Sequence, residues 1–172
     1  MRRLRAKHAV ILATGTRPAL PNIDGLMSAS PWTNRDLATM TRVPARTIVL
    51  GGGVFGVECA TILSGLGSAV TLLVRGSALL RGSEPFVGSR VARGLQDHGV
   101  EIRYGTELTS VKRAHGGGIN ANAGDLRLES DEIVVATGRC VNTEDLGLET
   151  VGLRGGDFVA VDDNLKATGV DG

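Results

Sequence analysis

The chain has 172 residues, of which 42% are hydrophobic and only 3% aromatic, and its formal net charge is +1. This length fits one domain with appended pieces, and its core must be built from aliphatic side chains. The near-neutral charge argues against a dedicated nucleic-acid surface, so no nucleic-acid partner is expected. The apolar run at 9–13 is too short for a signal peptide or a transmembrane helix, so no membrane partner is expected either.

Apolar patterning predicts the first elements of the chain. They are a strand at 8–14, a loop at 16–30, one or two helical turns at 33–40 capped by Thr33 or Asn34, and a buried strand that starts at Thr47. The next are a helix at 54–66, a strand at 69–74, a loop at 75–84, a helix at 85–98 and a strand at 100–104. This β-α-β-α-β order predicts an α/β fold with a Rossmann-like parallel sheet. In the first long helix, the expected buried face consists of positions 54, 57, 61, 62, 63 and 66.

The second part of the chain has shorter elements with alternating polarity. Three segments, at 107–113, 119–122 and 126–130, predict an antiparallel three-stranded meander. A fully apolar strand at 132–137 follows. The remaining expected elements are a loop with a helical turn at 142–151 and a last strand at 158–161.

The cysteines and basic residues suggest no catalytic or metal centre. Cys59 and Cys140 are far apart and lack a C-x-x-C spacing, which predicts reduced thiols in a cytoplasmic protein. Cys59 lies within a predicted helix, where a buried thiol acts as an inert small hydrophobe. The three histidines show no metal-ligand spacing, so no metal site is predicted. The short basic run of Lys112, Arg113 and His115 is expected to be a solvated hairpin end.

The stretch TIVLGGGVFGVE at 47–58 contains the pattern Gly51-x-Gly53-x-x-Gly56 between a predicted strand and a predicted helix. The first glycine allows the tight turn, the second leaves room for a pyrophosphate, and the third lets the helix lie close to the strand. The pyrophosphate would sit at the helix N-terminus, where N–H groups and the helix dipole favour negative charge. We therefore predict that this turn, with Gly52, binds a dinucleotide.

Four stretches, in order, resemble the pyridine nucleotide-disulfide oxidoreductases, the family of glutathione, mycothione and mercuric reductases and dihydrolipoamide dehydrogenase. They are ATGTRP at 13–18, GGGVFGVE at 51–58, ATGRCVNT at 136–143, and the segment from VDDNL to threonine at 161–168. The first and third resemble the crossovers between FAD and NAD(P) domains, and the second resembles the NAD(P) fingerprint. The fourth resembles the strand and turn before the last FAD-binding segment. Val141 departs from the family pattern, which has proline there.

The resemblance implies three parts. Residues 1–44 would be the exit strand and linker of an FAD domain, 45–140 the NAD(P)-binding domain, and 141–172 a return segment toward the FAD domain. The family's FAD fingerprint, its C-x-x-x-x-C redox pair and its dimerisation domain do not occur in this sequence. We therefore expect a domain cut from a larger protein, whose partners are its own FAD and dimerisation domains. The full-length protein is expected to be a homodimer.

The end of the strand at 69–74 predicts which cofactor is used. An NAD-binding domain usually has an acidic residue there that accepts hydrogen bonds from the ribose 2′-OH, but this chain has Val74. Arg75 and Arg81 follow, and guanidinium groups suit a 2′-phosphate. The Arg-x5-Arg spacing also resembles that of the NADPH-using reductases. The alternative is that both are ordinary loop arginines, and nearby Glu84 weakens the positive field.

Other site residues are assigned through the resemblance. It implies that Glu58 lies by the nicotinamide and positions it against the flavin; the alternative is an acid favoured by the helix dipole. Val54 stands where some relatives carry a gating tyrosine, which implies a weaker gate. Phe55 is either helix core or a cover on the cofactor, and the family position favours the cofactor side. Gly138 and Arg139 would approach the nicotinamide and the flavin.

These observations favour the NADPH-binding domain of an FAD-dependent disulfide reductase-like oxidoreductase, which delivers hydride from NADPH to FAD in the intact enzyme. The fragment is expected to bind the nucleotide without turnover. Two alternatives stay open: a domain of an NADH oxidase or CoA-disulfide reductase relative, and a non-catalytic dinucleotide-binding sensor. The first generally has an acid where Val74 stands, and a sensor has no reason to keep both crossovers.

Overall fold

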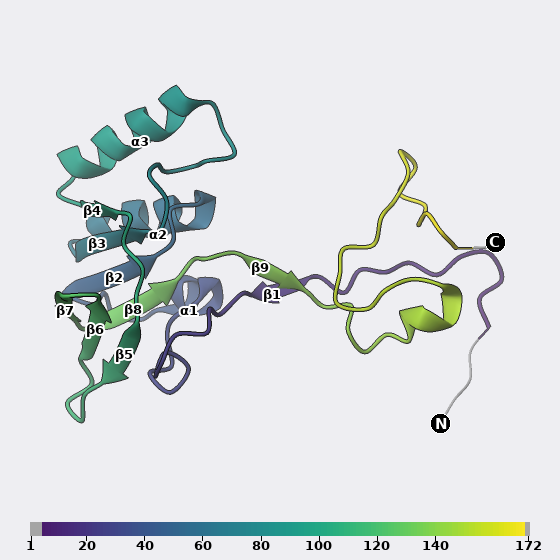
Figure 1. Ribbon diagram of the computed structural model, residues 1–172, viewed down its shortest axis with the longest axis horizontal. Coiled ribbons are helices and arrows are strands. Elements are labelled where there is room, and N and C mark those ends of the chain that lie inside the picture. Colours follow the sequence, from purple (N-terminus) through teal and green to yellow (C-terminus); the bar gives the residue numbers. More distant parts are fainter. Residues whose placement is uncertain (1–4, 171–172) are drawn as a thin grey trace. The chain divides into compact units, whose positions relative to one another are not determined.

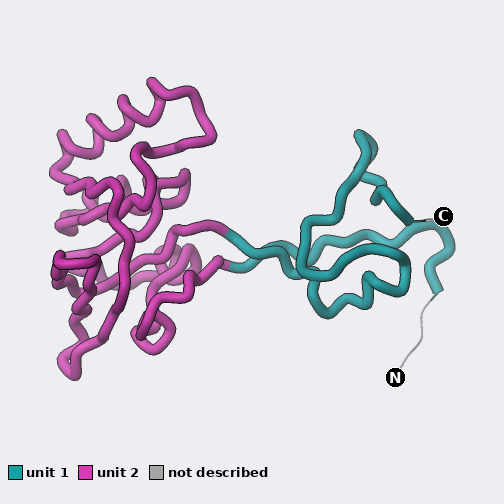
Figure 2. Tube along the Cα trace, viewed as in Figure 1, with its two compact units in different colours: residues 1–17, 139–172 teal, residues 18–138 magenta. Residues whose placement is uncertain are grey.

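The computed structural model describes residues 5–170, and the chain divides into two compact units. One unit comprises residues 18–138, and the other comprises residues 1–17 with 139–172 (Figure 2). No helix in the described part of the chain is long and apolar enough to cross a membrane.

The larger unit is built on a parallel sheet of four strands in the order β4-β3-β2-β8 (Figure 1). Its strands and long helices are β2 (Arg46–Leu50), α2 (Val54–Gly65), β3 (Ala69–Val74), α3 (Pro85–Asp97), β4 (Glu101–Tyr104) and β8 (Glu132–Val135). The central strands are runs of Val, Leu and Ile because both faces of a parallel sheet are covered. The predicted Rossmann-like βαβαβ unit is confirmed, with nearly the predicted limits.

Two layers cover the sheet, α2 and α3 on one face and an antiparallel meander on the other (Figure 1). Val49 lies opposite Leu72 and Val134 in register, and all three pack toward the helices. Their sequence neighbours on the same strands point the other way, because successive side chains alternate between the faces of a sheet. The meander confirms the prediction, and it consists of β5 (Ser110–Arg113), β6 (Ile119–Ala123) and β7 (Leu126–Ser130).

The short helix α1 (Asn34–Thr39) begins where the sequence predicts, with Thr33 as its N-cap. The Asp36 carboxylate accepts hydrogen bonds from the backbone N–H and the hydroxyl of Thr33, both at 2.8 Å. Hydrogen bonds of this kind hold the chain at a helix start.

The predicted buried face of α2 is wrong. Val54, Ile62 and Leu66 are exposed, and among the predicted positions only Leu63 is fully buried. The face that meets the sheet carries small residues instead, at Gly56, Cys59 and Ala60, together with Leu63. Close approach of the helix to the strands decided its orientation, and large apolar side chains would have held it away.

Arg113 is not the solvated hairpin residue that the sequence predicts. Its guanidinium donates to the Ala29 carbonyl at 2.8 Å, to the Gly117 carbonyl at 2.7 Å and to Glu132 Oε1 at 2.5 Å. Only 11% of the Glu132 side chain and 27% of the Arg113 side chain are exposed. The pair therefore ties the meander to the first residue of β8.

The smaller unit contains little regular structure. Its described elements are β1 (Thr16–Pro18) paired with β9 (Arg139–Val141), and a 3-10 turn, η1 (Leu148–Val151), within the expected loop. Arg17 donates to the Val141 carbonyl at 2.8 Å and to Glu144 at 2.7 Å, and this hydrogen-bonded carboxylate raises the pKa of the Arg17 guanidinium.

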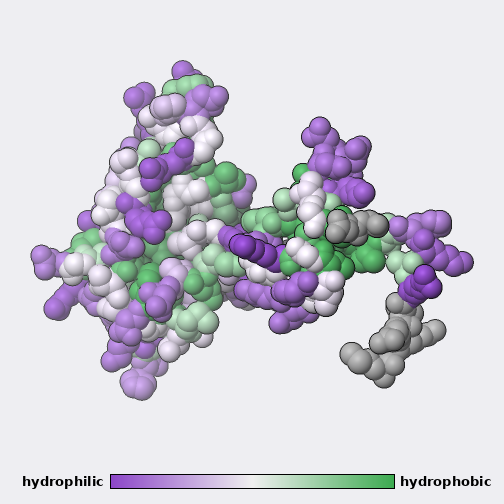
Figure 3. Space-filling model, turned by 45° about the vertical axis from the view of Figure 1, so that its right-hand side comes forward, coloured by the Kyte–Doolittle hydropathy of each residue, from purple (hydrophilic) through white to green (hydrophobic). Residues whose placement is uncertain are grey.

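The strands predicted at 8–14 and 158–161 do not form. Val10, Ile11 and Phe158 are instead 76%, 88% and 78% exposed. Figure 3 shows hydrophobic side chains on the surface of this unit. A strand needs neighbouring strands for its backbone hydrogen bonds. Among the described residues, no strand pairs with 8–14, and 158–161 has only an isolated antiparallel bridge between Val161 and Ala167.

Candidate nucleotide-binding site

The turn after β2 is so closely packed that two of its glycines cannot carry side chains. Gly51 has φ +123°, and a Cβ there would lie 2.4 Å from the Ala136 carbonyl oxygen. A Cβ on Gly56 would lie 1.8 Å from the Gly51 carbonyl oxygen. The first and third glycines of the motif therefore act as the sequence analysis expects, one in the turn and one in the close contact of helix and strand.

Gly53 differs from its neighbours because open space surrounds it. It is the N-cap of α2, and a Cβ added there would meet nothing within 4 Å. No side chain caps the helix, and the first N–H groups of an α-helix have no intrahelical acceptor. This combination of open space, outward N–H groups and the positive end of the helix dipole fits a pyrophosphate.

The loop between β3 and α3 is hydrogen-bonded to the glycine turn. The Leu80 N–H donates to the Gly52 carbonyl at 2.9 Å, and Leu79 is buried. A Cβ on Gly52 would meet Val74 at 2.8 Å and Leu79 at 3.0 Å, so this glycine packs over the end of β3. The loop is thereby held beside the place that the pyrophosphate would take.

The structure brings Arg81 back to the end of β3, where Arg75 stands. The Arg81 side chain crosses Gly76 closely: a Cβ on Gly76 would lie 3.1 Å from both Cδ and Nη1 of Arg81. The Arg75 side chain is 84% exposed. Val74, in contrast, is buried and offers no polar side-chain atom.

Glu107 is a residue near this site that the sequence analysis missed. Its Oε1 lies 4.0 Å from Arg75 Nη1. The signal that could have found it is its position shortly after β4, because the carboxyl ends of neighbouring parallel strands meet at one edge of the sheet.

The other predicted site residues in the larger unit lie at the start of α2 and after β8. Glu58 and Val54 are exposed, and no hydrogen bond or ion pair involves the Glu58 side chain among the described residues. Phe55 is half-buried against the helix-side core, so it packs at least partly as a core residue. Gly138 has φ +130° with open space around it, and its carbonyl accepts the Ala19 N–H at 3.0 Å.

Arg139 belongs to the smaller unit. Its Nη2 donates to the Thr16 carbonyl at 2.6 Å, and its Nε donates to the Thr16 hydroxyl. The Arg139 guanidinium therefore holds β9 to β1.

Cys59 is fully buried in α2. Burial and the neighbouring Glu58 charge raise its thiol pKa to about 12. At neutral pH it stays protonated and a poor nucleophile, in keeping with the inert role expected of it.

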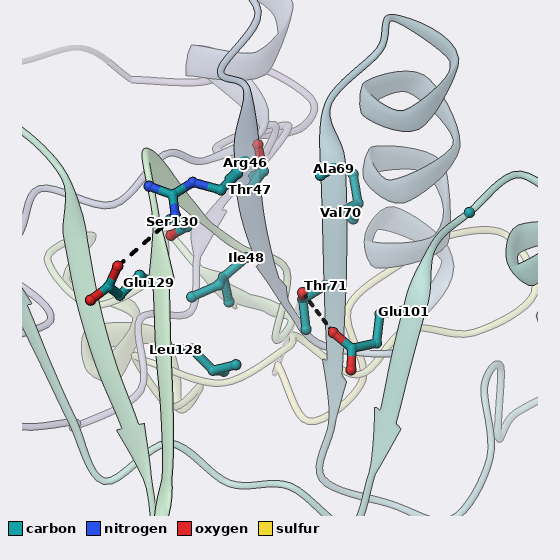
Figure 4. Close-up of a pocket in the computed structure, with 11 residues that line it drawn as sticks. Arg46, Thr47, Ile48, Ala69, Val70, Thr71, Glu101, Leu128, Glu129 and Ser130 are labelled. Carbon is teal, nitrogen blue, oxygen red and sulfur yellow. Dashed lines mark hydrogen bonds and ion pairs between the residues drawn. The ribbon is translucent and has the colours of Figure 1, made fainter.

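A groove of about 260 Å³ lies at the opposite edge of the sheet, where the parallel strands begin (Figure 4). Its polar side chains mostly bind one another: Thr71 donates to Glu101 at 3.3 Å, and Arg46 lies 4.0 Å from Glu129. The described residues include no group of three or more His, Cys, Asp or Glu side chains that could hold a metal ion.

Comparisons with known proteins agree with the motif resemblance. A family model described as pyridine nucleotide-disulphide oxidoreductase matches residues 2–172. The chain is 35% identical over 162 residues to the mercuric reductase of Streptomyces lividans, covering 91% of this chain and 34% of that protein. It is 37% identical over 145 residues to the glutathione reductase of Burkholderia cepacia, covering 83% of this chain and 31% of that protein.

Among solved structures, the chain resembles the HOCl-induced flavoprotein disulfide reductase RclA from Escherichia coli. The TM-score is 0.81 at 26% identity, and the match covers 91% of this chain and 37% of that one. The chain thus spans about a third of the length of the curated relatives it matches. From its motifs, its fold and these matches, the chain belongs to the pyridine nucleotide-disulphide oxidoreductase family.

Proposed function

We propose that residues 45–140 form an NADPH-binding domain of an FAD-dependent, disulfide reductase-like oxidoreductase. The observation that carries this proposal is the glycine turn, where Gly51 and Gly56 allow the tight turn and the close approach of α2, and Gly53 leaves open space at the start of the helix. The nucleotide pyrophosphate would lie on the N-terminus of α2 and receive hydrogen bonds from its N–H groups. In the intact enzyme the bound NADPH supplies hydride to FAD.

NADPH rather than NADH is proposed because of the charges at the end of β3. Val74 cannot accept a hydrogen bond from a ribose 2′-OH, whereas Arg75 and Arg81 can donate to a 2′-phosphate. A hydrogen bond to a charged group contributes about 1.5–3 kcal/mol. Because each 1.4 kcal/mol is a factor of ten, the pair would favour NADPH by roughly tens- to thousands-fold.

The exposed face of α2 and the turn after β8 would serve the nicotinamide end of the cofactor. The Glu58 side chain is exposed and makes no hydrogen bond or ion pair within the described residues, so its carboxylate is available to orient the nicotinamide. Val54 is 66% exposed and too short to act as a stacking gate. Gly138 lies in open space after β8, so a ring could approach its backbone there. For Arg139, we propose that it keeps the crossover strand in place beside the flavin.

The sequence contains no C-x-x-x-x-C pair, so the chain itself is expected to bind NADPH without turning over. The proposed partners are FAD and dimerisation domains of a longer, cytoplasmic homodimer. The names of the relatives, a mercuric reductase and a glutathione reductase, leave several electron acceptors open.

Isothermal titration of the chain with NADPH and NADH tests the proposal. NADPH should bind more tightly by a factor of ten or more, and Arg75→Ala or Arg81→Ala should weaken NADPH by roughly tenfold while NADH binding stays nearly unchanged. Arg127→Ala is the matched control, because Arg127 is an exposed arginine on β7 of the meander. Equal affinity for both nucleotides would reject NADPH selectivity and favour the NADH oxidase-like alternative.

A further inference from the structure

The loop that follows β4 is bonded to the end of β3. The pairing of Tyr104 with Val74 continues past both strands: the Gly105 N–H donates to the Gly76 carbonyl and the Thr106 N–H to the Val74 carbonyl, both at 3.1 Å. The backbone on either side of Arg75 is therefore fixed to the segment that leads directly into Glu107. This places an acidic side chain at the edge where the ribose 2′ group is proposed to bind.

The two arginines of this edge differ in their surroundings. Arg75 Nη1 has the Glu107 carboxylate 4.0 Å away, and both side chains are largely exposed, at 84% and 70%. Arg81 has no ion pair or side-chain hydrogen bond among the described residues, and it lies against the backbone of Gly76. In the free protein, Glu107 therefore lies within ion-pair distance of Arg75, whereas no carboxylate of the described residues does so for Arg81.

We propose that Glu107 is a specificity-determining residue that competes with the 2′-phosphate of NADPH for Arg75. This inference rests on the proposed nucleotide site. A 2′-phosphate carries negative charge and is repelled by the Glu107 carboxylate, while the neutral 2′-OH of NADH is not. Glu107 therefore lowers the preference for NADPH, and it makes Arg81 the stronger of the two phosphate-binding arginines.

The test is titration of NADPH and NADH into the chain and its Glu107→Gln variant at low ionic strength. Glu107→Gln should tighten NADPH binding by about 1.5- to 5-fold, the range expected for one exposed charge pair, and leave NADH binding unchanged. The gain should shrink when salt is raised to about 1 M, where the screening length falls to about 3 Å. In an Arg75→Ala background the gain should be smaller, because the group for which Glu107 competes is then missing.

Glu129→Gln is a closely matched control. Glu129 is 73% exposed and also lies 4.0 Å from an arginine, Arg46, but at the opposite edge of the sheet. The Glu129→Gln variant removes the same charge as Glu107→Gln, and it should leave the affinities for NADPH and NADH unchanged. Equal tightening by both variants would show a general charge effect and overturn the role of Glu107.

The outcomes separate this inference from the proposed function. If Arg75→Ala and Arg81→Ala weaken NADPH but Glu107→Gln does not strengthen it, only the inference about Glu107 fails. If Glu107→Gln weakens NADH, Glu107 accepts a hydrogen bond from the ribose and the inference is again overturned. If the unaltered chain does not bind NADPH, the proposed function fails and the inference fails with it.

Discussion

The two edges of the parallel sheet differ in how their polar groups are used. At the edge where the strands begin, Arg46 is bonded to Asp131 and the buried hydroxyls of Thr47 and Ser68 lie 2.9 Å apart. At the edge where the strands end, Gly53 faces open space and Arg75 is 84% exposed. At the first edge, the polar groups beside the groove are mostly bonded to one another, whereas at the second edge Gly53 and Arg75 leave donors and positive charge exposed.

This difference shows why a hollow alone does not identify the proposed nucleotide site. A dinucleotide is an extended, charged molecule, so what it needs is a row of donors and positive groups with no side chain in the way. The strand ends provide this arrangement. At the strand starts, the polar groups that line the groove mainly stabilise the fold.

The largest expected effect comes from adding one methyl group at the site edge. Gly56→Ala would place a Cβ 1.8 Å from the Gly51 carbonyl oxygen, so α2 must move away from the sheet. We expect a loss of about 3 kcal/mol or more in the free energy of unfolding and loss of nucleotide binding, measured by urea unfolding and titration. Gly65→Ala, at the open end of the same helix, should instead stabilise by about 0.5–1 kcal/mol.

The next largest effect is expected at the opposite edge, where Glu132 begins β8. Arg113→Gln would leave the Glu132 carboxylate buried without its ion-pair partner. We expect a loss of about 2–3 kcal/mol in unfolding free energy, less than for a fully buried pair because Arg113 is partly exposed. Lys112→Gln on the same hairpin should change the unfolding free energy by less than about 0.5 kcal/mol. A similar loss in both variants would contradict the role of the pair.

A smaller effect, confined to binding, should separate the roles of the glycines. Gly53→Ala meets no neighbouring atom, so the unfolding free energy should change by no more than about 1 kcal/mol. The added methyl group would stand where the pyrophosphate approaches, and NADPH and NADH should both bind about tenfold more weakly. Unchanged affinity in this variant would place the pyrophosphate somewhere other than the start of α2.

The smallest effect is expected for Asp131, which accepts the Arg46 N–H at 2.8 Å. This hydrogen bond holds the pKa of the Asp131 carboxyl below its ordinary value. A depressed pKa stabilises the fold above the unfolded-state pKa of about 4, and that stability is lost as the pH falls through the folded-state value. The melting temperature of Asp131→Asn should therefore lie below that of the unaltered chain at pH 7 and converge with it in acid. Nucleotide affinity at pH 7 should not change.

Sequence patterns predicted the central part of the fold well because its signals are local. The run of apolar residues before Gly51 is fully buried in a parallel strand, and the glycines after it sit where a turn and a close helix contact require them. Helix α2 ends one residue before its predicted limit, and Gly67, with φ +94°, follows its C-cap residue Leu66 in a conformation that suits glycine.

The errors occurred where a residue's environment depends on distant parts of the chain. The apolar run at 8–14 has the composition of a strand, but composition cannot supply a neighbouring strand. The predicted face of α2 was wrong because the helix turns its small residues, among them Gly56 and Ala60, toward the sheet rather than its large apolar ones. Arg113 looked like a surface residue until the fold placed Glu132 beside it.

The sequence alone therefore determined the family, the βαβαβ order and the identity of the glycine turn, since each depends on residues that are close together in the chain. Only the tertiary structure decided which of those glycines are packed and which one is open. It also decided that Arg81 folds back over Gly76 and that Glu107 stands beside Arg75. Glu107 and Arg75 follow strands that are adjacent in the sheet but separate in sequence, and only the pairing of β3 with β4 brings them together.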